Sequence, residues 1–416
     1  MQARLPRVLI VCALLIGRRA DGQARPAGLR EDIQSSAVEL RRLHPKLAFG
    51  ETRARFDSAV AATLALPPWT PRHRLIVHWA EAIATIHDGH TQLRLADDPA
   101  IGFHRFPLRV YWFAEGMYVT AAPRGLERVL GARLAAVDGM PIAQVIARVR
   151  PVVHGDNDMT VRDVLPSRLM LAEVLETVGV TRSLTHATFS IETGGGDSVT
   201  LTASPVDATI DWVRARDATP TPLYLAHPDE PYWYTYIDSL HAMYVQYNEV
   251  STNAEHPFPA FCAALFAAVD SVGADNLILD IRFNNGGDNT LLRPLVLGLI
   301  RSRRVDRPGH LFTVIGRLTF SAAVNLAAEL ERYTETTFVG EPTAAPANHY
   351  GETQRVRLPR TNILLLHSTL YWQGADPRDT RPWIAPTLAA PPTAATYFAG
   401  RDPALEAITQ AIHAAP

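Results

Sequence analysis

The sequence predicts a multidomain α/β protein, and three observations point to that fold class. The chain has 416 residues, more than one ordinary hydrophobic core accommodates. Hydrophobic residues make up 47% and charged residues 20%, a globular composition that excludes wholesale disorder. From about residue 222 onward, strand-like runs alternate with helix-like runs, which is typical of crossover units around a largely parallel sheet. We therefore expect an α/β domain over residues 206–416, preceded by smaller regions.

The region 27–97 is expected to be helical. Apolar residues recur there at helix-like spacings, as at Ile33 and Leu40, and a second helical run covers residues 72–86 after a cluster of prolines. That run ends at Asp88-Gly89, which is a turn signal.

The region 100–205 is expected to be rich in strands. Alternating patterns predict short strands, and a glycine run at 194–196 predicts the turn of a hairpin. The expected strands cover residues 106–112, 117–121, 133–137, 187–191 and 198–203.

The first 24 residues are typical of a secretory signal peptide. Arg4 and Arg7 precede an apolar run over residues 8–17, and small residues follow at 22–24. The run is about half the length that spans a bilayer, so we expect no stable membrane span. Removal of this segment would leave Cys262 as the single cysteine, and no internal disulfide could form. These features predict export to the periplasm, cell envelope or surroundings of a bacterium.

Two segments at predicted strand ends carry candidate chemistry. The buried strand 276–281 leads to Gly286 and Gly287, where bare backbone N–H groups can approach a ligand. The strand 311–315 leads to Ser321 at the start of a helix expected over 320–333. One crossover separates the two turns, so they can meet at the same edge of a parallel sheet.

A nucleophilic role for Ser321 would use these surroundings. The N–H of Ala322, together with that of Gly286 or Gly287, would form an oxyanion hole. The alternatives are that Ser321 is only a helix cap and that the glycine pair is an ordinary turn. The sequence contains no Gly-x-Ser-x-Gly elbow, which argues against an α/β-hydrolase.

A serine nucleophile also needs a base. His90, in the turn that follows Asp88-Gly89, is the first candidate, and His349 is the second. Lys46 is the only lysine in the chain, and nothing around it indicates activation. His87 and His90 offer two metal ligands without a clear third, and His-Glu-x-x-His is absent, so the sequence predicts neither a metal nor another cofactor.

Four blocks of the sequence, in order, resemble the tail-specific, or C-terminal-processing, serine peptidases. Residues 277–287, which end in Arg-Phe-Asn-Asn-Gly-Gly, are similar to the glycine block of that family, and residues 319–323, Thr-Phe-Ser-Ala-Ala, to its nucleophile block. Residues 338–343, Phe-Val-Gly-Glu-Pro-Thr, resemble the segment that follows it. Residues 88–91, Asp-Gly-His-Thr, resemble the histidine block of the tricorn-core-like branch.

This resemblance implies a crotonase-like (ClpP/crotonase) catalytic core over residues 206–416, a PDZ-like domain over 100–205 and the helical region before them. It implies Ser321 as the nucleophile, with Gly286 or Gly287 and Ala322 as oxyanion donors. The tail-specific branch uses a lysine base after Val-Gly-Glu, but residues 341–346 contain none. The tricorn branch implies His90 as the base and a carboxylate near the last strand, for which Asp379 or Asp376 is the nearest candidate.

The sequence therefore predicts an exported serine endopeptidase or carboxyl-terminal-processing peptidase that acts on a peptide or protein substrate. A net charge of −2 without a basic stripe gives no indication of a nucleic-acid partner. A catalytically inactive peptide- or ligand-binding protein on the same scaffold is the alternative, since a fold does not fix a function. An acyl-CoA enzyme is a third, less favoured alternative, and the oligomeric state stays open.

Overall fold

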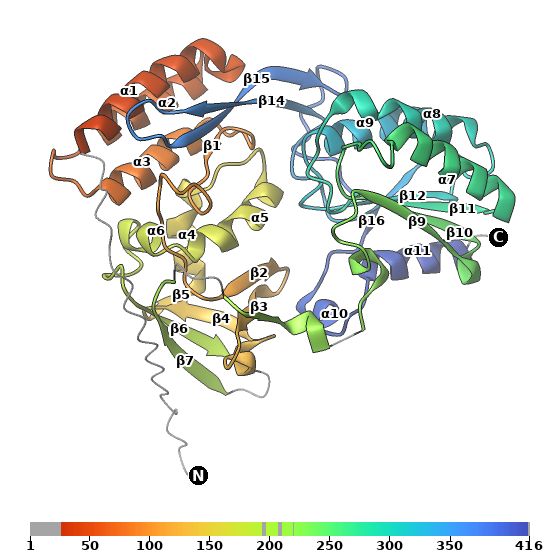
Figure 1. Cartoon of the computed structure of the whole chain (residues 1–416), viewed down its shortest axis with the longest axis horizontal. Helices are drawn as coiled ribbons and strands as arrows, with labels where there is room; N and C mark the ends of the chain where they lie inside the picture. The colour runs from red at the N-terminus through yellow and green to blue at the C-terminus, as the bar shows by residue number, and fades with distance from the viewer. Residues whose placement is uncertain (1–25, 194–196, 207–209, 219, 415–416) are drawn as a thin grey trace, which may run out of the picture. The chain divides into compact units, whose positions relative to one another are not determined.

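The computed structural model describes residues 26–414, apart from 194–196, 207–209 and 219 (Figure 1). The predicted signal segment therefore lies outside the described residues. The chain forms two compact units. Unit 1 comprises the chain up to Gly155, Val161–Ala218 and Tyr350–Tyr371, and unit 2 comprises Asp156–Thr160, Thr219–His349 and the chain from Trp372 onward. Among the described helices, none is both long and apolar enough to cross a membrane.

Three helices form the N-terminal part of unit 1, as the spacing of apolar residues predicted. Ile33, Phe56 and Trp79 are fully buried and belong to one core, so each helix turns one apolar stripe inward. The helices are α1 (Pro26–Leu43), α2 (Glu51–Leu64) and α3 (Arg72–Ala84).

A mainly antiparallel sheet follows in unit 1, in the strand order β2-β3-β4-β6-β7. Its strands are β2 (Arg109–Phe113), β3 (Gly116–Pro123), β4 (Arg133–Val137), β6 (Ala187–Glu192) and β7 (Ser198–Ala203), with β5 (Met140–Pro141) and β8 (Trp212–Arg214) paired to β4 and β3. The predicted hairpin over 187–203 is confirmed as β6 and β7, although its glycine run lies outside the described residues. Helices α4 (Ile142–Val149), α5 (Asp158–Leu169) and α6 (Ala172–Thr177) accompany this sheet. Its PDZ-like character stays a prediction.

A hairpin from late in the sequence joins unit 1, which the sequence pattern did not indicate. Its strands are β14 (Asn348–Arg357) and β15 (Leu364–Gln373), and β15 pairs with β1 (Gln92–Leu93) just after the predicted histidine block. The buried carboxylate of Asp32 on α1 holds the hairpin turn, because it accepts hydrogen bonds from the backbone N–H groups of Arg360 and Thr361. Residues 350–371 thus return to the N-terminal unit.

Unit 2 contains a six-stranded sheet in the order β16-β13-β12-β11-β10-β9. All its pairs are parallel except β9 with β10, which confirms the predicted α/β pattern. The strands are β9 (Tyr232–Ile237), β10 (Ala242–Tyr247), β11 (Asn276–Asp280), β12 (Leu311–Ile315), β13 (Thr337–Gly340) and β16 (Leu388–Ala389).

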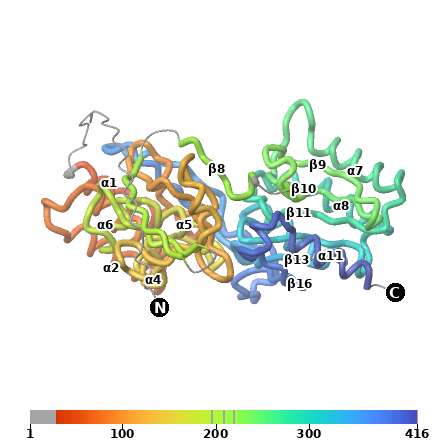
Figure 2. The backbone as a smooth tube through the Cα atoms, turned by 90° about the horizontal axis from the view of Figure 1, so that it is seen from below, coloured from red at the N-terminus to blue at the C-terminus, as the bar shows by residue number. Residues whose placement is uncertain are grey.

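Helices cover both faces of this sheet. Leu277 and Leu279 point into a core with α7 (Phe258–Val272), α8 (Arg293–Arg301) and α9 (Ala322–Tyr333), whereas Ile278 points into a second core with α11 (Pro403–Ala414). Figure 2 shows α7 and α8 on one side of β10 and β11 and α11 on the other. Burial on both faces explains why these strands are continuously apolar. The remaining described helix is α10 (Ala394–Phe398).

Candidate functional site

The turn after β11 requires both of its glycines. Gly286 has φ +98° and Gly287 has φ +143°, conformations that side chains rarely permit. A Cβ atom on Gly287 would lie 2.1 Å from the carbonyl oxygen of Val250. Val250 fixes this turn through two backbone hydrogen bonds, from its N–H to Gly286 O and from the N–H of Asp288 to its own carbonyl oxygen. The turn is therefore tightly packed at Gly286 and held by Val250, although Gly287 itself is exposed.

Ser321 occupies the residue directly before α9, with an unusual backbone. Its φ is +56° and its ψ is −127°, a conformation that is strained for a residue other than glycine. The helix begins at Ala322, slightly later than predicted, and the Ser321 side chain makes no capping hydrogen bond. The helix-cap interpretation therefore accounts for the position of Ser321 at the start of a helix. It does not account for the hydroxyl, which makes no capping hydrogen bond. The nucleophilic serines of α/β-hydrolases also sit on strained turns between a strand and a helix.

The glycine turn and the serine turn pack directly against each other in unit 2, as their spacing predicted. A Cβ atom on Gly286 would lie 2.6 Å from Ser321 Cβ and 2.9 Å from the N atom of Ala322. The N–H of Phe320 donates to the carbonyl oxygen of Asn284 over 3.1 Å, which joins the two turns. The carboxyl ends of β11 and β12 thus place the two turns together at one edge of the sheet.

The hydrogen bonds distinguish the three predicted oxyanion donors. The N–H of Gly286 already donates to Asn284 Oδ1 over 2.9 Å. Within the described part of the chain, the N–H groups of Gly287 and Ala322 donate to no backbone carbonyl. Gly287 and Ala322 are therefore better suited to bind an oxyanion, while Gly286 allows the close approach of Ser321.

Two buried ion-pair groups support these turns, and the sequence analysis missed both. Arg317, at the start of the serine turn, donates to both carboxylate oxygens of Glu341 beyond β13, over 3.0 and 2.5 Å. Arg282, at the start of the glycine turn, binds Asp280 and Asp402. Burial alone would lower the pKa of Arg282, but the two carboxylates hold it well above its ordinary value. Such arginine–carboxylate forks fix geometry as well as charge.

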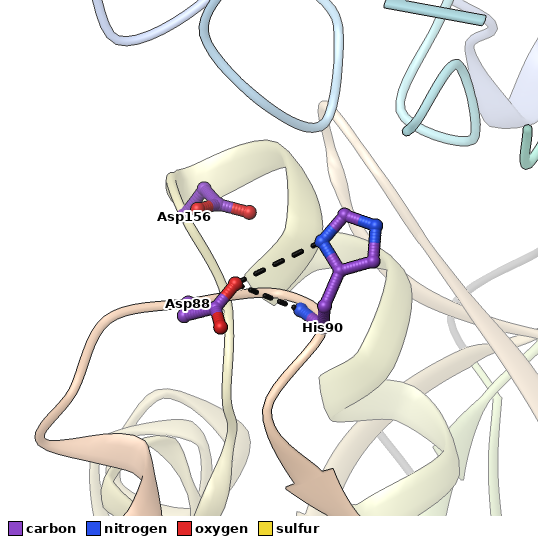
Figure 3. A group of neighbouring side chains, drawn as sticks. All are labelled: Asp88, His90 and Asp156. Carbon is purple, nitrogen blue, oxygen red and sulfur yellow. Dashed lines mark hydrogen bonds and ion pairs between the residues drawn. The ribbon is translucent and has the colours of Figure 1, made fainter. Parts of the chain in front are cut away.

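His90 lies in unit 1, in the turn between α3 and β1 (Figure 3). Its backbone N–H donates to Asp88 Oδ1 over 3.0 Å, and its ring Nδ1 lies 3.8 Å from the same oxygen. Both side chains are buried. The predicted histidine block therefore forms a fixed carboxylate–imidazole pair within one turn.

Asp88 is the centre of a larger group of buried donors. His44 Nε2, Thr91 Oγ1 and Ser368 Oγ lie 2.8, 2.5 and 2.7 Å from Asp88 Oδ2. Burial would raise the pKa of Asp88, but the hydrogen bonds from His44 and the proximity of His90 hold it well below the ordinary value. His44 and Ser368 are distant in sequence, so the sequence pattern gave no signal for them.

The other candidate residues have different surroundings. Asp379 receives hydrogen bonds from Arg381 on both carboxylate oxygens, which lower its pKa, and Asp376 is paired in the same way with Arg378. The Nδ1 atom of His349 lies 3.1 Å from a backbone carbonyl oxygen. Lys46 donates to the carbonyl oxygen of His87 and lies over the ring of Tyr350. The catalytic roles of Ser321, His90 and Asp379 stay predictions, and so does the absence of a metal or cofactor.

Acid should destabilise the protein through His154, a buried histidine of unit 1. Burial, followed by the charge of Arg168, lowers the pKa of His154 to about 3. The unfolded chain binds a proton there below about pH 6.5, whereas the folded chain does not until about pH 3, so stability is lost as the pH falls between these values. We expect this residue to remove roughly 2 kcal/mol between pH 7.5 and 5. Urea unfolding at both pH values should show a smaller acid loss in His154→Gln, and an equal loss would contradict this.

Comparisons with known proteins give structural neighbours only. No family model matches the sequence, and no curated protein matches it. The structure of mature CPAF complexed with lactacystin is similar at a TM-score of 0.67 and 12% identity, covering 94% of this chain and 100% of that one. A crystal structure of a CPAF mutant gives 0.65 and 12%, covering 95% and 99%. The photosystem II D1 C-terminal processing protease gives 0.44 and 14%, covering 92% and 96%.

At this identity the likeness concerns the fold. It extends over nearly the whole of both chains. The chain therefore shares the fold of mature CPAF, and the resemblance of its sequence blocks to the tail-specific peptidases is confirmed at the level of the fold.

Proposed function

We propose that this protein is an exported serine peptidase that hydrolyses peptide bonds through an acyl-enzyme on Ser321. The observation that carries this proposal is the strained backbone of Ser321, with φ +56° in a turn packed against Gly286. A helix cap needs no such strain, because a cap residue normally has an extended backbone. Strain at a polar residue beside unused N–H donors is typical of a functional site.

His90 is the base in this mechanism. It accepts the proton of the Ser321 hydroxyl as Oγ attacks the carbonyl carbon of the peptide, and the oxyanion binds the N–H groups of Gly287 and Ala322. His90 then returns the proton to the leaving amine, and the peptide C–N bond breaks. Water then attacks the carbonyl carbon of the ester while His90 takes one of its protons. The bond from that carbon to Ser321 Oγ breaks, His90 passes the proton to Oγ, and the carboxyl product leaves. Asp379 is the proposed acidic partner.

The domain assignment belongs to the same proposal. Unit 2 would hold the crotonase-like core, and the sheet of β2, β3, β4, β6 and β7 would be a PDZ-like domain that binds substrate ends. The substrate of the protein would be a peptide or unfolded protein segment outside the cytoplasm. Deletion of residues 1–24 should retain the protein in the cytoplasm of an expressing bacterium, as measured by fractionation.

A fluorophosphonate probe tests the serine mechanism directly. The full-length mature protein should be labelled with time-dependent, saturable kinetics, and mass spectrometry should place the adduct on Ser321. Peptides tagged at either end then distinguish internal cleavage from carboxyl-terminal processing. A folded wild-type protein that binds peptides but is neither labelled nor active would support the binding-protein alternative instead.

Substitution of the base should slow labelling strongly without unfolding the protein. We expect His90→Gln to lower the second-order labelling rate by about 100-fold or more, the range usual for loss of a general base. His349→Gln is the matched control, because His349 was the other candidate base, and its labelling rate should equal that of the wild type. Equal rates for His90→Gln and the wild type would exclude His90 as the base.

A further inference from the structure

The hydrogen bonds around Asp88 define one cluster in unit 1, which we call the Asp88 cluster: His44, Asp88, His90, Thr91 and Ser368. Three segments that are far apart in sequence contribute to it: the end of α1, the turn before β1 and strand β15. The carboxylate of Asp88 is fully buried. Burying a charge costs free energy unless hydrogen bonds replace those lost to water. Several donors surround this one carboxylate for that reason.

The two oxygens of Asp88 have different partners. Oδ2 accepts hydrogen bonds from the side chains of His44, Thr91 and Ser368. Oδ1 accepts one from the backbone N–H of His90 and lies 3.8 Å from the Nδ1 atom of its ring. One oxygen is thus held by the scaffold, while the other is aimed at the imidazole of His90 (Figure 3).

The tautomer of His44 follows from its neighbours. The backbone N–H of Lys46 donates to His44 Nδ1 over 3.2 Å, so that nitrogen carries no proton. The proton of His44 is therefore on Nε2, which donates it to Asp88 Oδ2. His44 acts as a fixed donor behind the carboxylate.

The other titratable groups that face the cluster leave the charge of Asp88 in place. Burial lowers the pKa of His154 to about 3 and also lowers the pKa of His367, so both are neutral near pH 7. Burial raises the pKa of Tyr350, which is neutral as well. A second carboxylate also faces the histidine: one oxygen of Asp156, one of Asp88 and a ring nitrogen of His90 lie within 4.8 Å of one another (Figure 3). Of these two carboxylates, Asp88 is the one whose position is fixed by buried donors.

We propose that Asp88 is a positioning residue for His90, and that His44 fixes the Asp88 carboxylate from behind. This inference rests on the proposed function. The carboxylate favours the tautomer of His90 with its proton on Nδ1, which leaves Nε2 to accept a proton from Ser321. Its negative charge also favours the imidazolium that forms during acylation, in addition to the acidic partner proposed above.

Asp88→Asn tests this role by the pH profile of fluorophosphonate labelling. We expect the rate at pH 7 to fall about 10- to 100-fold, less than for a carboxylate in direct contact. The acidic limb of the profile, which is the range of low pH over which the labelling rate rises, should move to lower pH by about one unit. The reason is that the carboxylate no longer stabilises the imidazolium. An unchanged rate and an unchanged limb would overturn the inference.

Asp32→Asn is the matched control. Asp32 is equally buried in unit 1 and accepts hydrogen bonds from Thr361 and Arg360. Its substitution should lower the free energy of unfolding but leave the acidic limb where it is. A limb that moves equally in both variants would show that Asp88 acts only through stability, and the inference would be wrong.

A second pair of variants covers the case in which Asp88→Asn does not fold. His44→Leu removes the donor behind the carboxylate, whereas His44→Gln retains an N–H that can donate to it. We expect a three- to tenfold lower labelling rate and a shifted limb for His44→Leu, with recovery in His44→Gln. Equal wild-type behaviour in both would overturn the inference.

Proton NMR separates this inference from the proposed function. In a Ser321→Ala background, the His90 ring resonance can be assigned by its loss in His90→Gln and followed against pH. The titration midpoint of that resonance should move to lower pH in Asp88→Asn or His44→Leu, whether or not the protein is a peptidase. Failure of wild-type labelling with this shift present would reject the peptidase function but keep the positioning role, whereas an unmoved midpoint would reject the positioning role alone.

Discussion

Ser321→Ala is expected to abolish both fluorophosphonate labelling and peptide hydrolysis. In the proposed mechanism the adduct forms on the hydroxyl of Ser321, whose Cβ atom packs against the glycine turn. Loss of a nucleophilic serine commonly costs 10³-fold or more in turnover, so we expect a residual rate below about one thousandth. Labelling measured by gel fluorescence and hydrolysis measured with a quenched peptide should fall together.

The strained backbone adds a prediction on stability to the same site. Alanine retains the unfavourable φ of +56°, whereas glycine adopts it without strain. We expect Ser321→Gly to be as inactive as Ser321→Ala but more stable in urea unfolding by about 1 kcal/mol. Such a gain on loss of activity is the mark of a site that stores strain for function.

The opposite pattern would contradict the nucleophile assignment. If Ser321→Ala hydrolyses peptides at the wild-type rate, another residue is the nucleophile. A Ser321→Gly protein less stable than Ser321→Ala would show that the backbone at this residue is not strained.

Gly286→Ala is expected to have the second largest effect on activity. The added methyl group would lie 2.6 Å from Ser321 Cβ, and 2.9 Å from the carbonyl oxygen of Phe320. Neither neighbour is the far end of a flexible side chain, so the serine turn itself has to move. A displacement of about 1 Å can cost 100-fold in rate, and we expect a loss of at least that size in the labelling assay.

Gly309→Ala separates this steric effect from backbone strain. Gly309 has φ +81°, comparable to the +98° of Gly286, but a Cβ atom there meets no atom within 4 Å. We expect both substitutions to reduce stability by about 1 to 3 kcal/mol, and only Gly286→Ala to reduce activity. Equal activity in the two variants would show that the contact between Gly286 and Ser321 does not matter.

The α/β pattern of unit 2 was predictable because its central strands, β10, β11 and β12, are buried on both faces. Leu277, Ile278 and Leu279 form a continuous apolar run, and the helices between strands have their own periodicity. Element ends were less accurate. The first strand of the expected β-rich region begins at Arg109 rather than at residue 106, because Phe106 donates its N–H to Met170 and Pro107 has no N–H to donate.

The hairpin of β14 and β15 was not predictable from periodicity. Its strand β15 pairs with β1, more than 250 residues earlier, and local patterns carry no record of such a distant partner. The same applies to the donors of the Asp88 cluster. His44 and Ser368 look like ordinary residues of a helix end and a strand until the fold brings them to one carboxylate.

By itself the sequence determined the order of the four family blocks, the position of Ser321 between a strand and a helix, and the absence of a lysine in the loop after β13. Those are properties of local pattern and spacing. Only the tertiary structure decided the conformation of Ser321. Its positive φ occurs where the serine turn packs closely against the glycine turn, and Gly286 permits this packing because it has no side chain. The tertiary structure also decided which donors surround Asp88, because buried charges are satisfied by whichever groups the fold brings within hydrogen-bonding distance.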